Sequence, residues 1–218
     1  MNHVERGLMK CPERGAAMQG RIKAVLIDFG GVIADEGFRD GLHAIARQQK
    51  LDPGPFFAIV DSLIDETGYL TGMSDEPAFW NAVRARTGII AGDGALRREI
   101  LSRFVIRQEM LAVIDRIRSR GISVAMLSDQ TDWLEEIDKE TGLFRHFDRV
   151  FNSFRMHKSK RDASLFRDVC AIIQTAPEQT LFVDDNIDHI KRASKEGLHT
   201  IHFVSVNDFI GRLEGSMT

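Results

Sequence analysis

The stretch Ile22-Lys-Ala-Val-Leu-Ile-Asp-Phe-Gly-Gly-Val32 begins with a short apolar run, which is followed by the acid Asp28 and by the glycines Gly30 and Gly31. Such a run is typical of a strand that is buried on both faces of a parallel sheet. Four more apolar runs end in acidic or small polar residues, at 122–129, 149–153, 180–185 and 199–204. The sequence therefore predicts five strands, of which the first covers residues 22–29.

Amphipathic helical segments lie between most of these runs. Two apolar helical faces consist of Met110, Leu111, Val113, Ile114 and Ile117, and of Leu165, Phe166, Val169, Cys170 and Ile173. Gly121 and Gly197 stand where helices would end. The alternation predicts a doubly wound α/β fold with a parallel five-stranded sheet, which binds ligands at the carboxyl ends of its strands.

The segment between the first and second predicted strands is too long for a single crossover. Its helical pattern is interrupted by prolines and glycines, among them Pro53, Pro55 and Pro77. We interpret residues 36–104 as an inserted helical cap that would cover the strand ends and exclude water from a site there. Residues 21–35 and 105–218 would form the core domain, and residues 1–20 an N-terminal extension.

Composition and charge narrow the function classes. The 218 residues are 43% hydrophobic and carry a formal net charge of −3, so they lack the basic surface of nucleic-acid and membrane binders. Residues 1–20 contain no signal-peptide run, and no stretch approaches the roughly 20 apolar residues of a membrane-spanning helix. Two cysteines, Cys11 and Cys170, indicate neither a disulfide framework nor a metal cluster, and fit the reducing cytoplasm best.

Polar groups follow the first two predicted strands. Asp28 ends the first strand, before two glycines that let the backbone approach a ligand closely, although Asp28 could equally cap a turn. Ser128 and Asp129 follow the second strand, where they could instead cap the next helix. Each group by itself is therefore ambiguous.

The pair Asp184 and Asp185, directly after the fourth predicted strand, is the strongest local signal. Adjacent carboxylates repel each other, and the simplest compensation is Mg²⁺, which prefers oxygen ligands. The alternative is an acid-rich helix N-terminus. Lys160 lies in a polar loop before a helix, where a lone lysine is usually a solvated surface group.

These groups would meet because the carboxyl ends of parallel strands share one edge of a sheet. Asp28 would attack phosphorus and form an aspartyl-phosphate, while Mg²⁺ and Lys160 neutralise the phosphoryl oxygens and Ser128 donates a hydrogen bond. The set therefore predicts an enzyme that removes a phosphoryl group from a small soluble metabolite.

The order of these motifs resembles the haloacid dehalogenase (HAD) superfamily of hydrolases, over roughly residues 21–205. Residues 68–80, GYLTGMSDEPAFW, are similar to the cap of small sugar-phosphate phosphatases and of the phosphatase domain of soluble epoxide hydrolases. The resemblance implies catalysis by Asp28, Ser128 and Lys160, substrate binding by Ser128, Asp129 and Lys160, and Mg²⁺ binding by Asp28, the main-chain carbonyl of Gly30, Asp184 and Asp185.

Three positions depart from the family pattern. Gly30 stands where most phosphatases of the superfamily have a second Asp that acts as general acid and base, and loss of such a group typically costs about 10²–10⁴ in rate. Leaving-group protonation would fall to water, to the substrate or to a cap residue. Asp129 replaces a more common Asn, and Arg161 replaces a common Pro. Arg161 extends a basic loop that either grips a second anionic group or is simply solvated.

Other functions stay open at this point. A metal-independent dehalogenase also lacks the second Asp, but it usually replaces the acidic pair by small polar residues. A mutase would need an acid to activate its acceptor, and a catalytically weak or dead relative would bind a phosphorylated ligand or a protein. The candidate pocket residues Arg39, His43, Tyr69 and Trp80 each have an ordinary structural explanation as well. The oligomeric state is not indicated.

Overall fold

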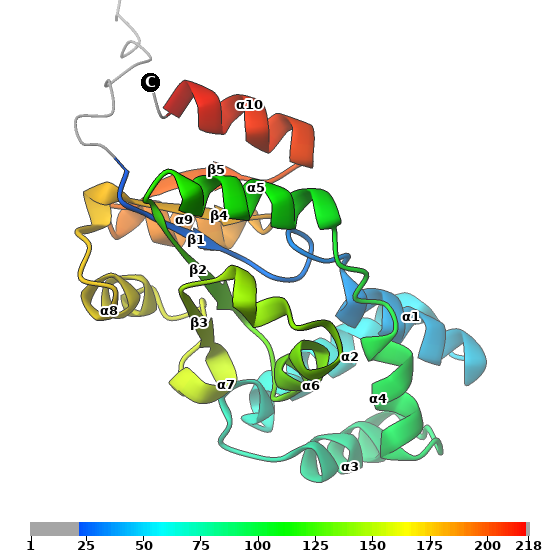
Figure 1. Cartoon of the computed structure of the whole chain (residues 1–218). Coiled ribbons are helices and arrows are strands. Elements are labelled where there is room, and N and C mark those ends of the chain that lie inside the picture. Colours follow the sequence, from blue (N-terminus) through cyan, green and yellow to red (C-terminus); the bar gives the residue numbers. More distant parts are fainter. Residues whose placement is uncertain (1–21, 217–218) are drawn as a thin grey trace, which may run out of the picture.

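The computed structural model describes residues 22–216 as an α/β fold around one sheet (Figure 1). The predicted extension at residues 1–20, which includes Cys11, lies outside the described residues. The strands are β1 (Ala24–Ile27), β2 (Ser123–Ser128), β3 (Arg149–Asn152), β4 (Thr180–Asp184) and β5 (His199–His202). All neighbours pair in parallel, in the order β3-β2-β1-β4-β5, which confirms the predicted five-stranded parallel sheet.

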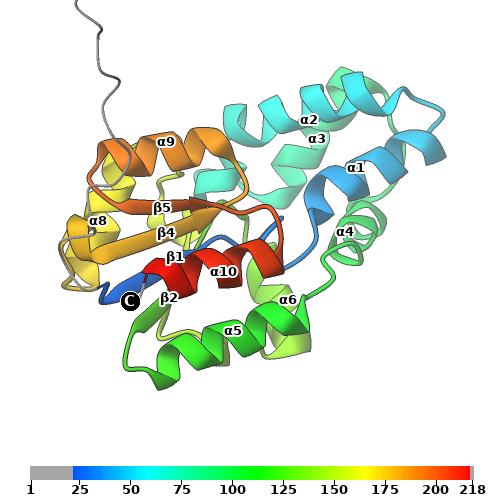
Figure 2. The ribbon, with the colours of Figure 1, turned by 90° about the horizontal axis from the view of Figure 1, so that it is seen from above.

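Helices cover both faces of the sheet (Figure 2). One face carries α5 (Gln108–Ser119) and α10 (Val206–Ser216), and the other carries α8 (Ser164–Ile172) and α9 (Ile187–Lys195). Alternate residues of β1 serve the two faces, because Val25 and Ile27 belong to the apolar cluster that includes α5, whereas Leu26 packs in a second cluster with α8 and α9. Burial on both faces explains the continuous apolar run in this strand.

Four helices lie between β1 and α5: α1 (Gly37–Gln48), α2 (Pro53–Glu66), α3 (Glu76–Thr87) and α4 (Asp93–Leu101), with the 3₁₀ helix η1 (Tyr69–Thr71). We call residues 37–101 the helical insertion. Its two connections to the sheet run side by side, since Ala34 forms an antiparallel bridge with Ile106. The side chains of Asp52 and Asp75 cap the starts of α2 and α3, each directly ahead of a proline-containing first turn.

The remaining short elements are α6 (Trp133–Thr141), η2 (Leu143–His146), α7 (Ser153–Met156) and η3 (Pro177–Gln179). The chain runs from β1 to β2 and β3 on one side, and then to β4 and β5 on the other, so the strand order reverses at β1. Open α/β sheets bind ligands at such a reversal, outside the carboxyl ends of the strands. In the described part of the chain, no helix is both long and apolar enough to cross a bilayer.

Candidate active site

The pairing of β1 with β4 places two acids side by side. Ile27 lies opposite Val183, and the backbone N–H of Asp28 donates to the Val183 carbonyl at 2.9 Å. Asp28 and Asp184 therefore stand at the same level at the ends of adjacent strands. Lys160 Nζ lies 2.7 Å from Asp28 Oδ1 and 2.8 Å from Asp184 Oδ2. Three side chains from distant parts of the sequence thus meet at one edge of the sheet.

Lys160 is not a solvated surface lysine, because only 1% of its side chain is exposed. Burial opposes its charge, but Asp184 and Asp28 together raise the pKa of Lys160 well above its usual value. Burial likewise opposes ionisation of Asp184, yet Lys160 and His189 hold the pKa of Asp184 below its usual range. Lys160 and Asp184 therefore form a buried ion pair at this edge of the sheet.

Asp185 completes a group of three carboxylates. One oxygen from each of Asp28, Asp184 and Asp185 lies within 4.8 Å of the others. Burial raises the pKa of Asp28 well above its usual value, with Lys160 opposing the shift, and burial together with the charge of Asp184 raises the pKa of Asp185. We call Asp28, Lys160, Asp184 and Asp185 the strand-end cluster. Three close carboxylates against one ammonium leave negative charge uncompensated, and oxygen donors of this kind suit Mg²⁺.

The two glycines after Asp28 differ in their structural roles. Gly31 has a φ of +75°, and a Cβ on it would lie 2.1 Å from Asp185 Oδ2. Only glycine therefore lets the loop after β1 pass this close to Asp185. Gly30 has no left-handed φ, and a Cβ there would make ordinary contacts at 3.6 Å with Glu36 Oε2 and 3.8 Å with the ring of Phe104.

Arg107, from the segment ahead of α5, holds the same loop in place. Its Nη1 donates to the carbonyls of Gly31 at 2.6 Å and Val32 at 2.8 Å, and its Nη2 to Asp35 at 2.9 Å. The sequence gives no signal for this contact, because 76 residues separate Arg107 from Gly31. Arg107 thus fixes the backbone beside the strand-end cluster without lining the site.

Ser128 and Asp129 lie at the end of β2. Ser128 is buried, pairs with Asn152 in the sheet and is absent from the cavity lining, so its predicted bond to phosphate stays a prediction. Asp129 lines the cavity and accepts the backbone N–H of Lys160 at 2.9 Å. This contact fixes the loop that carries Lys160.

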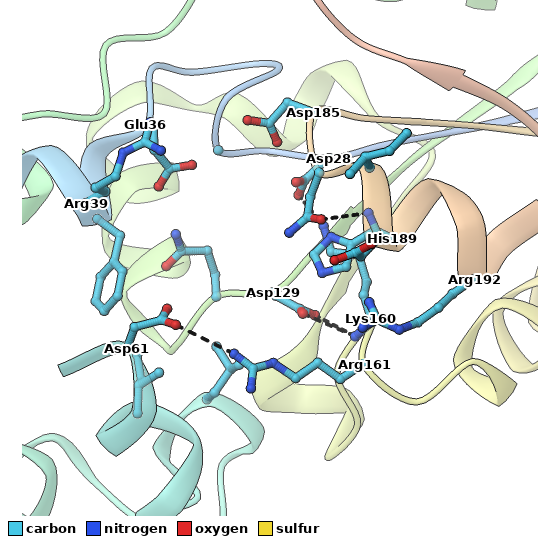
Figure 3. Close-up of a pocket in the computed structure, with 18 of the residues that line it drawn as sticks. Asp28, Glu36, Arg39, Asp61, Asp129, Lys160, Arg161, Asp185, His189 and Arg192 are labelled. Atoms are coloured by element: carbon cyan, nitrogen blue, oxygen red, sulfur yellow. Dashed lines mark hydrogen bonds and ion pairs between the residues drawn. The ribbon is translucent and has the colours of Figure 1, made fainter. Parts of the chain in front are cut away.

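A cavity of about 760 Å³ opens above the strand-end cluster (Figure 3). Its lining combines strand-end residues with residues of α1, α2 and α9, including Asp28, Gly30, Glu36, Phe57, Asp129, Lys160, Asp185 and His189. The helical insertion therefore supplies one wall of the cavity, and the carboxyl edge of the sheet supplies the other. This enclosure suits a small ligand.

Several polar residues of this cavity escaped the sequence analysis, among them His189 and Glu36. His189 Nδ1 lies 3.1 Å from Asp184 Oδ2, on the first turns of α9. The sequence signal that could have identified His189 was its position five residues after Asp184. Glu36 immediately precedes α1, and burial together with the charge of Asp185 raises the pKa of its carboxyl. Its position in a polar stretch of sequence carried no signal for a role in the site.

Of the four insertion residues considered from the sequence, only Arg39 lines the cavity. Tyr69 and Trp80 are fully buried and belong to an aromatic cluster that also contains Phe79, Trp133 and Phe154. The ring of His43 packs edge-on against Phe57. Tyr69 and Trp80 are therefore core residues, which was the alternative to a role in the pocket.

The basic loop around Lys160 is tied down by acids. Arg155 pairs with Glu135 and Lys158 with Asp168, each at 2.6 Å. Arg161 Nη1 lies 2.6 Å from Asp65 on α2, so it joins this loop to the helical insertion. These pairs account for the loop's charges within the chain, but Arg161 also lines the cavity, so its contact with a second anionic group stays a prediction.

The sequence model of the family described as haloacid dehalogenase-like hydrolase matches residues 22–195. The chain belongs to this family. It is thus a HAD-family hydrolase, and the match spans β1, the helical insertion and the strand-end cluster. The resemblance in the order of the motifs is confirmed.

Individual HAD proteins are similar over most of their length. The enolase-phosphatase E1 of Shewanella frigidimarina (strain NCIMB 400) is 24% identical over 213 residues, which cover 86% of this chain and 91% of that protein. A magnesium complex of a HAD family enzyme from Bacteroides thetaiotaomicron has a TM-score of 0.72 at 21% identity, covering 88% of this chain and 98% of that one. The L-2-haloacid dehalogenase from Xanthobacter autotrophicus has a TM-score of 0.62 at 17% identity, covering 90% and 84%. At these identities, the two structures show the fold alone.

Proposed function

We propose that this hydrolase is a Mg²⁺-dependent phosphatase that acts on a small phosphorylated metabolite of sugar-phosphate type through an aspartyl-phosphate on Asp28. The observation that carries the proposal is Lys160, held 2.7 Å from Asp28 and 2.8 Å from Asp184 beside a third carboxylate. A nucleophilic carboxylate between a fixed ammonium and a candidate divalent-ion site is what phosphoryl transfer requires.

In the proposed reaction, an Asp28 oxygen attacks phosphorus and the bond to the leaving oxygen breaks. Lys160 and Ser128 bind the phosphoryl oxygens, and Asp129 holds the Lys160 loop. Water then cleaves the aspartyl-phosphate and restores the Asp28 carboxylate. The residues that would hold Mg²⁺ are Asp28, Asp184, Asp185 and the carbonyl of Gly30, and the ion would supply positive charge that offsets charge on the phosphoryl group.

In this proposal, residues 36–104, which contain the helical insertion, form a cap over the core of residues 21–35 and 105–218. Its residues already line the cavity on the side facing the strand-end cluster. A closed wall would exclude bulk water from the aspartyl-phosphate until the leaving group departs. Cytoplasmic location fits Cys170, which is free and buried.

The main rival is dehalogenation, which uses a similar nucleophile on carbon. One structural neighbour is a dehalogenase with chloropropionic acid covalently bound. The acidic pair of this chain favours phosphoryl chemistry, because a dehalogenase that works without a metal has no use for Asp185 beside Asp184. The phosphatase among the relatives, and a neighbour in complex with magnesium and inorganic phosphate, add support.

The test measures release of inorganic phosphate from a panel of sugar phosphates and from p-nitrophenyl phosphate, and halide release from 2-haloacids in parallel. We expect phosphate release with Mg²⁺, none with EDTA, and a loss of about 10⁴-fold or more in Asp28→Asn, since the nucleophile is removed. Halide release without metal would assign the chain to the dehalogenases. Binding of phosphorylated ligands with no turnover would identify a binding protein.

A further inference from the structure

We infer that Glu36 is the general acid and base of the reaction, an inference that rests on the proposed phosphatase function. A sugar alkoxide is a poor leaving group, so its oxygen needs a proton as the bond to phosphorus breaks. The electron pair of the broken bond stays on the leaving oxygen, which takes the proton from the Glu36 carboxyl. In the second step, the Glu36 carboxylate takes a proton from the attacking water, and the bond between Asp28 and phosphorus breaks.

Most of the other titratable groups of the cavity wall are already engaged. Lys160 is bound between Asp28 and Asp184, and His189 contacts Asp184. Further acids have partners too: Asp129 accepts the Lys160 backbone N–H, Asp61 lies 3.8 Å from Arg161, and Asp188 lies 3.1 Å from Lys191. Among the cavity acids outside the strand-end cluster, Glu36 and Asp129 have no salt-bridge partner in residues 22–216, and both oxygens of Asp129 accept the Lys160 backbone N–H. Glu36 interacts with the backbone N–H and the charge of Arg39, but burial raises the pKa of its carboxyl, which leaves it as the carboxyl placed to exchange a proton.

The position of Glu36 fits the task. A Cβ on Gly30 would lie 3.6 Å from Glu36 Oε2, so this carboxyl fills the space beside the second residue after the nucleophile. Glu36 thus reaches, from the start of α1, the place that a longer side chain at position 30 would occupy. In Figure 3 its carboxyl points into the cavity.

Packing around the next residue holds Glu36 in this place. The ring of Phe104 lies so close to Gly37 that a Cβ there would come within 2.5 Å of it. The backbone N–H of Gly37 donates to the Asp35 carbonyl at 2.8 Å, and the Asp35 N–H donates to the Val105 carbonyl at 3.0 Å. The start of α1 is therefore fixed to the segment that leaves the helical insertion.

The test compares Glu36→Gln with the wild-type enzyme on two esters: the best sugar phosphate of the panel and p-nitrophenyl phosphate. The value of kcat/KM reports the first step, in which the leaving group departs. The leaving group p-nitrophenolate departs without a proton, so this step needs no general acid for the aryl ester. We expect kcat/KM of Glu36→Gln to fall about 10²–10⁴-fold for the sugar phosphate. For the aryl ester it should fall less than about tenfold, while kcat falls further and phosphoenzyme accumulates in intact-protein mass spectra because the base of the second step is missing.

Two more variants sharpen the test. Gly30→Asp in a Glu36→Ala background, where the shortened side chain clears the space beside position 30, places a carboxyl there and should restore at least tenfold of the activity on the sugar phosphate that Glu36→Ala loses. Asp61→Asn removes another cavity carboxyl and should change kcat/KM for both esters by the same factor. Stabilisation by Mg²⁺ in thermal unfolding should be equal in wild type and Glu36→Gln, which separates proton transfer from metal binding.

Each other outcome is decisive. Equal losses on both esters, or no loss on either, would overturn the role of Glu36 while leaving the phosphatase proposal intact. A wild-type enzyme that releases phosphate from neither ester would overturn the proposed function, and the inference with it.

Discussion

The strand-end cluster and the aromatic cluster both lie where the helical insertion meets the core, but they differ in chemistry. The first gathers three carboxylates and one ammonium in a mostly buried position. The second stacks Trp80 on Trp133 at 6.0 Å and sets Tyr69 edge-on to Trp133 at 5.8 Å. The aromatic rings pack against one another and two of them donate hydrogen bonds to acids, Tyr69 to Asp132 and Trp80 to Glu76, whereas the charged group has an excess of negative charge. The stability of the strand-end cluster should therefore depend on Mg²⁺, and that of the aromatic cluster should not.

Replacing Lys160 should give the largest effect. Lys160→Met leaves Asp28 and Asp184 close together in a buried position without the ammonium between them, which should cost about 3–5 kcal/mol of unfolding free energy. Urea unfolding in EDTA measures this loss, and added Mg²⁺ should recover part of it. Lys158→Met is the matched control, because that lysine lies two residues earlier in an exposed ion pair. Equal losses in the two variants would show that burial of Lys160 has no energetic consequence.

The aromatic cluster should respond to truncation alone. Phe79→Ala removes a fully buried ring that contacts Tyr69, Trp80 and Trp133, at a cost of about 3 kcal/mol. The loss in urea unfolding should be the same with Mg²⁺ and with EDTA. A loss that changes with Mg²⁺ would show that the two clusters are coupled, and would break the comparison.

The fold could be predicted from the sequence because strands and helices are recognised from the pattern of residues that are close together in the sequence. The five apolar runs and the helical face of 107–120 needed only periodicity, and all five strands and α5 lie where that pattern predicted. The reversal of strand order at β1 also brings the ends of β1 and β4 together, which makes the meeting of Asp28 with Asp184 a consequence of topology.

Contacts that depend on three-dimensional packing could not be predicted from the sequence. Arg107 binds carbonyls 75 and 76 residues away, and the burial of Lys160 depends on the path of a loop that Asp129 fixes. Glu36 was missed because an acid ahead of a helix has an ordinary explanation as a cap. Tyr69 and Trp80 could not be separated into core or pocket residues, since aromatic side chains serve both purposes.

Magnesium should stabilise the protein in a pH-dependent way through the strand-end cluster. Burial raises the pKa of Asp28 and Asp185, so at acidic pH these carboxyls hold protons that Mg²⁺ must displace. Stabilisation should therefore grow as pH rises through their raised pKa values, toward about 2.7 kcal/mol when Mg²⁺ is at a hundred times its Kd. Thermal unfolding at several pH values with Mg²⁺ or EDTA measures it. The same shift at every pH would place the ion elsewhere.

The smallest effect comes from one methyl group at the loop beside Asp185. Gly31→Ala must hold a φ of +75° and place Cβ 2.1 Å from the present position of Asp185 Oδ2, so the loop or Asp185 has to move. We expect a loss of about 1–3 kcal/mol from the backbone strain, together with weaker stabilisation by Mg²⁺. Gly30→Ala is the matched control, because its Cβ meets no atom closer than 3.6 Å and its φ is not left-handed. If both variants bind Mg²⁺ like the wild type, close approach of the loop to Asp185 is not what shapes the metal site; if only Gly31→Ala is impaired, the charged cluster depends on backbone geometry in a way that the aromatic cluster does not.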